Sequence, residues 1–273
     1  MKAVLITGAA NGIGLALTQV CLEKSFTVIM TDINKDKLSL EANELINRYP
    51  QKVFYYSCDV SKKEEVVQLA TFCYDKVKQL DWLFNNAGII GNLGPVWELT
   101  ENDIHRVMEV NLYGITNVIR SFIPYLFKQT NQSHIINMAS LYALCTGSQM
   151  AAYSMSKHAV LALSESLYFD LIRLEKPVNV SVVFPSFTDT SLLSSPSSNF
   201  HKQLGHLLSH SRPAIDIAEH IVREVEENKF YILPDKEVKG YCESRTNSIV
   251  LQEYPHKNSV EKLMCSLLKR TEV

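Results

Sequence analysis

Tyr153 and Lys157 are the residues whose types and spacing point most directly to chemistry. They lie four residues apart, near the start of a segment whose apolar residues recur at helical intervals until about Leu174. Side chains four residues apart on a helix share one face, so the phenol and the ammonium are expected to be neighbours. A positive charge beside a phenol favours the phenolate.

The free energy needed to ionise Tyr153 near neutral pH indicates that a ligand binds in front of the helix. An unperturbed phenol titrates near pH ~10, so work near neutrality requires the phenolate of Tyr153 to be stabilised by about 4 kcal/mol. One ammonium at the water-exposed end of a helix does not supply that much. A desolvated pocket that holds a second positive charge would supply it.

A glycine-rich turn follows the first predicted strand, residues 3–7, and precedes a helical pattern. The turn consists of Gly8, Ala9, Ala10, Asn11, Gly12, Ile13 and Gly14. In this order of strand, turn and helix, glycines let the backbone approach a pyrophosphate, and the helix N-terminus offers free N–H groups. The spacing Gly-x-x-x-Gly-x-Gly differs from the commoner Gly-x-Gly-x-x-Gly, and a tight turn without a ligand is the alternative.

Asp32 ends the second predicted strand, residues 26–31, about 20 residues after the glycines. An acid at this place can accept both ribose hydroxyls of an adenosine and would repel a 2′-phosphate. Asn11 adds no positive charge beside it. We therefore expect NAD rather than NADP, and the alternative is that Asp32 only caps the helix from Asn34 onward.

Polar or small residues follow further predicted strands. Asp59 and Val60 follow residues 52–57, and Asn85-Asn86-Ala87-Gly88 follows residues 80–84. Asp59 is a candidate acceptor for an adenine amino group, and the second group allows close approach of a ligand. Ordinary turns are the alternative for both.

Asn111 lies within a long helix predicted from Thr100 to about Phe127. Asparagine is a mediocre helix former because it competes for backbone hydrogen bonds. A mid-helix asparagine usually faces solvent, so a functional role for Asn111 needs support from elsewhere in the sequence.

Strands and helices alternate along the whole chain, which predicts an α/β fold: a doubly wound parallel sheet of about seven strands with helices on both faces. The remaining strands are predicted at 134–138, 178–184 and 229–233, and the remaining helices at 35–48, from Lys62 to about Lys78 with Ser61 as its cap, and from Pro213 to about Glu227. Open sheets of this class bind ligands at the carboxyl ends of their strands. We expect a single domain over residues 1–273.

Composition excludes several other classes of protein. The 273 residues are 46% hydrophobic and carry a formal net charge of −2, so a nucleic-acid partner has no electrostatic support. No apolar run reaches the ~18 residues of a membrane span, and a strand starts at residue 3, so no membrane association and a cytoplasmic location are expected. The six cysteines lack metal-ligand spacing and are expected to be reduced and mostly buried.

Two segments interrupt the alternation. Residues 188–212 are irregular and are predicted to form a lid over the substrate. Three histidines occur between residues 201 and 210 with no carboxylate or cysteine among them, so we expect no metal. Residues 235–273 form a polar C-terminal extension with one amphipathic patch, which is either a helix that docks across a subunit or a loose tail. The patch consists of Val260, Leu263, Met264, Leu267 and Leu268.

Together these motifs closely resemble the short-chain dehydrogenase/reductase family over about residues 2–234. The motifs are Thr7-Gly8-x-x-x-Gly12-x-Gly14, Asp59-Val60, Asn85-Asn86-Ala87-Gly88, Asn111, Ser140 and Tyr153-x-x-x-Lys157. The resemblance implies a Rossmann-type single domain, NAD or NADP as cofactor, and a homodimer or homotetramer.

The resemblance also implies catalytic roles. Tyr153 is expected to be the general acid and base, and Ser140 to hydrogen-bond the substrate oxygen. Lys157 is expected to lower the pKa of Tyr153 and to bind the nicotinamide ribose. The oxidised nicotinamide would supply the second positive charge. Asn111 is expected to distort its helix and to hold a water molecule that links Lys157 to solvent.

Cofactor contacts are expected from the residues that match the family's motifs. They are Gly8, Asn11, Gly12, Ile13, Gly14, Asp32, Ile33, Asp59, Val60, Asn86, Ala87, Gly88, Val110, Tyr153, Lys157, Pro185, Thr188 and Thr190. Ser186 stands where the family usually has glycine. Its side chain is expected to crowd the nicotinamide edge or to narrow the substrate mouth.

The substrate is expected to contact Ser140, Tyr142 and Tyr153. Leu141 and Leu144 flank Tyr142, and leucine and phenylalanine recur in residues 187–208. They suggest an apolar pocket for a hydrophobic secondary alcohol or ketone, cyclic or steroid-like, unless they pack the lid onto the core. We therefore expect an NAD-dependent alcohol dehydrogenase or ketone reductase. A non-catalytic NAD sensor or scaffold and an epimerase or dehydratase are the alternatives.

Overall fold

A seven-stranded sheet, in which every neighbouring pair of strands is parallel, forms the centre of the computed structural model of this protein. The structure describes residues 2–187, 206 and 211–271. The strands are β1 (Ala3–Thr7), β2 (Thr27–Asp32), β3 (Val53–Ser57), β4 (Trp82–Asn85), β5 (Ser133–Met138), β6 (Val178–Val183) and β7 (Tyr231–Ile232). Their order is β3-β2-β1-β4-β5-β6-β7, which confirms the predicted sheet.

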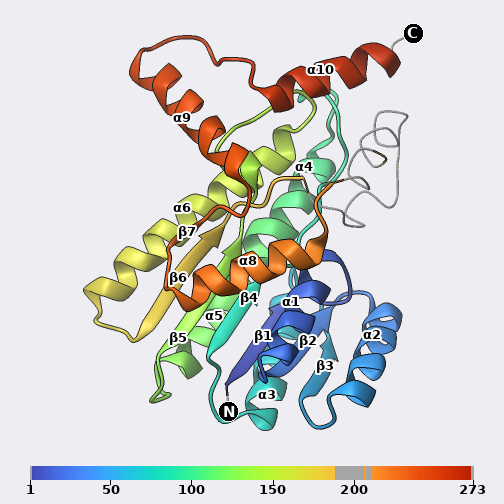
Figure 1. Ribbon diagram of the computed structural model, residues 1–273, viewed down its shortest axis with the longest axis vertical. Coiled ribbons are helices and arrows are strands. Elements are labelled where there is room, and N and C mark those ends of the chain that lie inside the picture. The colour runs from blue at the N-terminus through green and yellow to red at the C-terminus, as the bar shows by residue number, and fades with distance from the viewer. Residues whose placement is uncertain (1, 188–205, 207–210, 272–273) are drawn as a thin grey trace.

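Helices cover both faces of this sheet (Figure 1). The helices are α1 (Gly12–Glu23), α2 (Lys35–Arg48), α3 (Lys63–Lys76), α4 (Glu101–Met108), α5 (Gly114–Leu126), α6 (Ala151–Arg173), α8 (Ala214–Glu226), α9 (Lys236–Val250) and α10 (Ser259–Thr271). One hydrophobic cluster joins the sheet to α1, α2 and α8. The other joins it to α3, α5 and α6. The doubly wound class predicted from the sequence is confirmed.

Two helix starts test the local predictions. Thr100 Oγ1 accepts from the backbone N–H of Asp103 at 3.2 Å, and Asp103 Oδ2 accepts from the N–H of Thr100 at 2.9 Å. A capping box therefore starts α4 where the sequence predicts the start of a helix. The prediction for Ser61 was wrong. Ser61 Oγ donates to Asp59 Oδ1 at 2.7 Å, and α3 begins without a side-chain cap. A hydrogen bond from a hydroxyl to a charged carboxylate is stronger than one between neutral groups, so Asp59 holds the Ser61 hydroxyl.

The C-terminal extension forms two helices, α9 and α10, beyond the carboxyl edge of the sheet (Figure 1). Val260, Met264 and Leu267 of α10 are buried in the same hydrophobic cluster as Met150 and Tyr153. The sequence left a docking helix across a subunit and a loose tail as alternatives. The structure shows a third arrangement, in which α10 packs on the core of its own chain.

Two expectations from composition can be compared with the structure. All six cysteines are free, and four of them are buried, as predicted. Within the part of the chain that the structure describes, no helix is both long enough and apolar enough to cross a membrane.

His134 of β5 makes the stability of the fold sensitive to acid. Its Nε2 lies 2.7 Å from Ser181 Oγ, and burial lowers the pKa of His134 to about 4. The unfolded chain takes up the same proton near pH ~6.5. Acid therefore favours the unfolded chain, and the free energy of unfolding should fall by about 3 kcal/mol as the pH drops from ~6.5 to ~4. Urea unfolding at a series of pH values measures this. His134→Asn should flatten that part of the profile, and equal slopes in the two proteins would contradict the prediction.

Candidate active site

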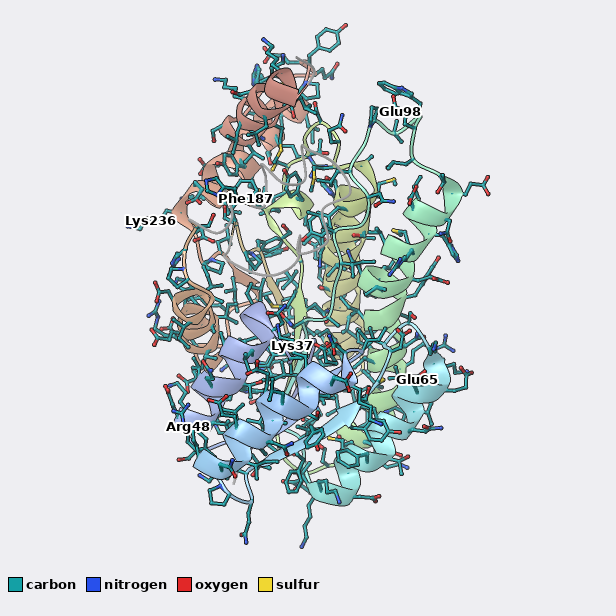
Figure 2. The ribbon with its side chains drawn as sticks, turned by 90° about the vertical axis from the view of Figure 1, so that its right-hand side faces the viewer. Lys37, Arg48, Glu65, Glu98, Phe187 and Lys236 are labelled. Atoms are coloured by element: carbon teal, nitrogen blue, oxygen red, sulfur yellow. The ribbon has the colours of Figure 1, made fainter. Side chains whose placement is uncertain are left out.

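A cavity of about 440 Å³ lies at the carboxyl edge of the sheet. Residues of the glycine turn and residues after β2 line one end, and residues after β5, after β6 and on α10 line the other. The wall consists of Gly8, Ala10, Asn11, Gly12, Ile13, Asp32, Asn34, Lys37, Asn86, Ala87, Gly88, Ile89, Ile90, Met138, Ala139, Ser140, Leu141, Tyr142, Met150, Tyr153, Lys157, Pro185, Ser186, Phe187 and Met264. Lys37 and Phe187, labelled in Figure 2, mark the two ends.

Tyr153 and Lys157 lie side by side in this wall, as their spacing on α6 predicts. Lys157 Nζ is 5.6 Å from the centre of the Tyr153 ring and donates to the carbonyl of Met138 at 2.9 Å. Ser140 hydrogen-bonds Tyr153. The structure therefore brings together a phenol, an ammonium and a hydroxyl from two elements.

Burial acts on both ionisable groups in the direction of their neutral forms. It raises the pKa of Tyr153 to about 12, and the hydrogen bond from Ser140 lowers that pKa by less than burial raises it. It lowers the pKa of Lys157 to about 8. Lys157 was expected to lower the pKa of Tyr153, but in this structure burial raises that pKa. The chain's own residues therefore do not make the phenol acidic, and a second positive charge in the cavity stays a prediction.

Asn111 is buried and does not face solvent, contrary to the usual position of a mid-helix asparagine. A π-helical turn (η1, Glu109–Tyr113) surrounds it, so the expected distortion of the helix is present. Its Oδ1 accepts from the N–H of Ile89 at 2.8 Å, and its Nδ2 donates to the carbonyl of Ile89 at 2.8 Å and to Ser156 Oγ at 3.0 Å. Asn111 therefore ties the segment after β4 to the helix that carries Tyr153.

The glycine turn packs against the segment after β4. Asn86 Nδ2 donates to the carbonyls of Thr7 and Gly8 at 2.9 and 3.2 Å. Gly8 has φ +64°, and a Cβ there would lie 2.9 Å from the Cα of Ala87. A Cβ on Gly14 would lie 2.1 Å from the carbonyl oxygen of Gly8. Gly8 and Gly12 line the cavity, whereas Gly14 serves the packing of the turn.

Asp32 lies at the end of the cavity that the sequence assigned to an adenosine. Its Oδ2 accepts from the N–H of Ala10 at 3.1 Å, and its Oδ1 accepts from the N–H of Asn34 at 2.9 Å. Asn34, rather than Asp32, caps α2, because Asn34 Oδ1 accepts from the N–H of Lys37 at 3.1 Å. The alternative of a purely capping Asp32 is therefore excluded.

Comparison with known proteins decides the family. The pattern described as "short chain dehydrogenase" matches residues 2–199. The chain is 38% identical over 193 residues to the 1-deoxy-11-beta-hydroxypentalenate dehydrogenase of Streptomyces exfoliatus, which covers 70% of this chain and 69% of that protein. The chain belongs to the short-chain dehydrogenase family. Its members are oxidoreductases that bind NAD or NADP and act on hydroxyl groups, and the predicted resemblance is confirmed.

Two further similarities extend this result. The 3beta-hydroxysteroid dehydrogenase 2 of Eggerthella lenta is 31% identical over 70% of this chain and 72% of its own length. A solved short-chain dehydrogenase/reductase of Burkholderia phymatum, crystallised with NAD, superposes with a TM-score of 0.89 at 28% identity, over 94% of this chain and 97% of its own. The fold of this short-chain dehydrogenase is thus that of solved relatives along almost its whole length.

Several residues expected to contact the cofactor lie outside the cavity wall. They are Gly14, Ile33, Asp59, Val60 and Val110. Ile33 is 67% exposed, and Asp59 Oδ1 accepts from the N–H and the Oγ of Ser61 at 3.0 and 2.7 Å. Thr188 and Thr190, together with most of the lid expected at 188–212, lie outside the described residues.

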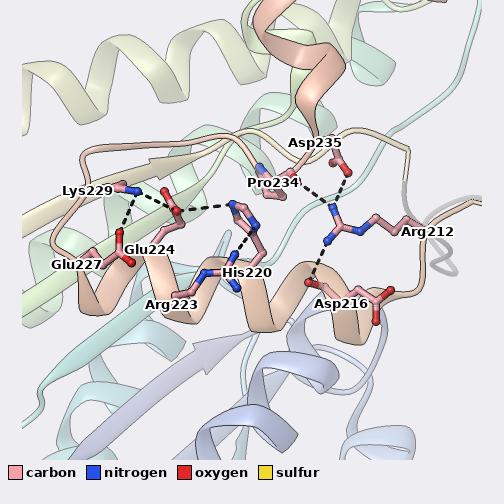
Figure 3. A network of polar contacts seen from close by, with 9 residues as sticks. All are labelled: Arg212, Asp216, His220, Arg223, Glu224, Glu227, Lys229, Pro234 and Asp235. Carbon is pink, nitrogen blue, oxygen red and sulfur yellow. Dashed lines mark hydrogen bonds and ion pairs between the residues drawn. The ribbon is translucent and has the colours of Figure 1, made fainter.

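Ser186 is held by a buried carboxylate. Asp235, just before α9, accepts from the N–H of Ser186 at 2.9 Å. It also accepts from Arg212 at 2.9 Å (Figure 3). Arg212 also donates to the carbonyls of Pro234 and Asp216, at 2.9 and 3.3 Å. One side chain from the C-terminal extension thus fixes the backbone that lines the cavity after Pro185.

Lys37, Met150 and Met264 also line the cavity, and the sequence did not predict this. Lys37 had a local signal, since it lies one turn into the helix that follows Asp32. Met264 was identified only as part of an amphipathic pattern, and such a pattern does not indicate the surface on which the helix packs. The described residues contain no cluster of His, Cys, Asp and Glu that could hold a metal ion.

Two glycine substitutions test the packing of the turn. Gly14→Ala places a methyl group 2.1 Å from the Gly8 carbonyl oxygen and should reduce the free energy of unfolding by about 3 kcal/mol. Gly240, within α9, has no neighbouring atom within 4 Å of the position of a Cβ. Gly240→Ala should therefore stabilise the fold by about 0.5–1 kcal/mol. Urea unfolding of both variants measures the difference, and a Gly14→Ala protein as stable as the wild type would refute the clash.

Proposed function

We propose that the protein is an NAD(H)-dependent oxidoreductase that interconverts a secondary alcohol and a ketone on a hydrophobic small molecule. The observation that carries this proposal is the buried phenol of Tyr153, beside Lys157 and Ser140, in the wall of a cavity at the carboxyl edge of the sheet. A phenol in this setting has the geometry of a proton donor and acceptor for a bound oxygen.

The residues of the cavity fit a dinucleotide. Gly8 and Gly12 both have positive φ, 64° and 50°, and they leave the start of α1 open to a phosphate. Asp32 offers a carboxylate at the far end for ribose hydroxyls. When bound there, a nicotinamide would supply hydride transfer, and the chain's own residues would supply the proton and the positioning.

The protein's part of the reaction is proton transfer and positioning. In the oxidation direction the phenolate of Tyr153 takes the proton of the alcohol hydroxyl, and in the reduction direction the phenol of Tyr153 gives its proton to the ketone oxygen. Ser140 holds the same oxygen by a hydrogen bond. Lys157, anchored on the Met138 carbonyl, places its charge next to the phenol and favours the phenolate. Asn111 positions α6 through Ser156.

The cofactor we propose is NAD, because Asp32 would repel a 2′-phosphate. Among the described residues of the cavity wall, Lys37 is the one positive charge at this end, and it would attract a 2′-phosphate. It belongs to the first turn of α2 and is only partly buried. The complex of the Burkholderia phymatum relative with NAD supports the same choice.

The substrate we propose is an uncharged, largely apolar alcohol or ketone of alicyclic type. Leu141, Met150, Phe187 and Met264 line the cavity around Tyr153, and no acidic or basic side chain other than Lys157 lines that end in the described chain. The names of two relatives, a hydroxypentalenate dehydrogenase and a hydroxysteroid dehydrogenase, support the same class. The homo-oligomeric state and the cytoplasmic location stay predictions.

Tyr153→Phe tests the reaction. The variant removes the proton donor and keeps the ring, so turnover of alcohols with NAD should fall at least a thousandfold while NADH binding stays near that of the wild type. NADH absorbance measures turnover, and NADH fluorescence measures binding. Tyr168→Phe, on the outer side of the same helix, is the matched control. Undiminished activity of Tyr153→Phe would refute the assignment. Tight NADH binding without oxidation of any alcohol in a broad panel would favour a non-catalytic sensor instead.

Asp32→Ser tests the cofactor. Removal of the carboxylate should raise the ratio of kcat/KM with NADP to kcat/KM with NAD by at least tenfold, about 1.4 kcal/mol. Asp36→Ser makes the same charge change on the exposed side of α2 and should leave the ratio unaltered. A wild type that prefers NADP would overturn the choice of NAD.

A further inference from the structure

Helix α10 contributes one side chain to the cavity, and that side chain is Met264. Val260, Met264 and Leu267 are spaced along one face of the helix and are buried, but only Met264 of the three lines the cavity. The residues of this helix lie outside the part of the chain that matches the family pattern, which ends at residue 199. Met264 therefore lines the cavity from a part of the chain that the family pattern does not describe.

A carboxylate one turn earlier fixes α10 to the loop that leads into α6. Glu261 accepts from the N–H of Ser148 at 2.7 Å and from Ser148 Oγ at 2.6 Å. A Cβ on Gly147 would lie only 3.0 Å from Glu261 Oε2, so the absence of a side chain at residue 147 admits the carboxylate. Partial burial raises the pKa of Glu261, but its bonds from Ser148 and Cys265 lower it overall, which keeps the acceptor charged.

The helix is also fixed at its start. Asn258 Oδ1 accepts from the N–H of Glu261 at 2.8 Å, and the hydroxyls of Tyr241 and Ser259 lie 2.8 Å apart, which joins α9 to α10. Several contacts from the same chain thus determine where Met264 stands. Its position is a property of the fold rather than of a free terminus.

These contacts place Met264 at the reacting end of the cavity. Ser148 lies between Tyr142 and Tyr153 in sequence, and the two tyrosine rings meet edge to face with their centres 5.9 Å apart. Met150, two residues after Ser148, lines the same end. The other end of the cavity is lined by the glycine turn after β1 and by α2 after β2. These strands lie on one side of the sheet, and β5 and β6 lie on the other side of the β1–β4 pair.

We propose that Met264 sets the size limit of the alcohol or ketone that reaches Tyr153, and that the bond between Glu261 and Ser148 holds Met264 in that position. This inference rests on the proposed function and adds the residue that determines its specificity. The substrate class that fits is an uncharged alicyclic molecule whose ring system ends against the thioether of Met264. A methionine suits this role because its flexible, polarisable chain adapts to irregular apolar surfaces.

The test uses two secondary alcohols that differ by one ring, cyclohexanol and decahydro-2-naphthol, with NAD and the full-length protein. Met264→Ala opens the cavity, so the ratio of kcat/KM for the bicyclic alcohol to that for cyclohexanol should rise about tenfold or more. Met264→Phe should lower the same ratio, and this opposite change distinguishes size from general damage. Glu261→Ala, which frees α10 from Ser148, should shift the ratio in the direction of Met264→Ala. Leu263→Ala truncates a neighbouring side chain outside the cavity wall and is the matched control.

The possible results distinguish a failure of the role of Met264 from a failure of the proposed oxidoreductase activity. Unchanged ratios in both Met264 variants, with the wild type active and NADH fluorescence normal, would overturn the inference and leave the proposed function intact. An unchanged ratio in Glu261→Ala would overturn the role of the Glu261–Ser148 bond. A wild type that binds NADH but oxidises neither alcohol would overturn the proposed function for this substrate class, and the inference with it.

Discussion

Burial of the Tyr153–Lys157 pair is the constraint on which the rest of the site depends. Desolvation disfavours the charged form of both groups, because a phenolate and an ammonium each lose their hydration in the wall of the cavity. The pKa of Tyr153 rises to about 12, and that of Lys157 falls to about 8. The chain therefore prepares the geometry of proton transfer but not its charge. A cation that binds in the cavity changes the balance for the phenol, so binding and acidity are linked in one site.

The same site depends on close contacts that no single helix or strand could make alone. Asn111 bonds to Ile89 and to Ser156 from within a π-helical turn. A Cβ on Gly88 would lie 3.2 Å from Asn111 Oδ1 and 3.5 Å from Lys157 Nζ. The first distance is shorter than an ordinary contact and the second is an ordinary contact, so a side chain at residue 88 would press on Asn111. The glycine thus lets the backbone after β4 lie close to the amide of Asn111 and beside the ammonium of Lys157.

The family resemblance, rather than a local signal, led us to expect Ser140 beside Tyr153. Local signals in the sequence predicted the seven strands, most of the helices between them and the shared helix face of Tyr153 and Lys157. These succeed because strand and helix periodicities are local and because parallel strands bring their carboxyl ends to one edge. Ser61 was mispredicted as a cap because Asp59, two residues away, competes for its hydroxyl. Asp235 and Met264 escaped prediction for another reason. Their roles arise where distant segments dock, and apolar spacing indicates that a helix packs without indicating against what.

The residues predicted to transfer the proton lie in a different part of the chain from Asp235 and Met264. The residues that could carry out proton transfer lie within residues 2–199, the part that matches the short-chain dehydrogenase pattern. Residues beyond it surround the same cavity: Asp235 fixes the N–H of Ser186, and Glu261 fixes the loop before α6. Both are carboxylates that accept backbone N–H groups, bonds that are stronger than neutral ones. The C-terminal helices are therefore built into the site from two sides. A change in their packing would therefore alter the shape of the cavity.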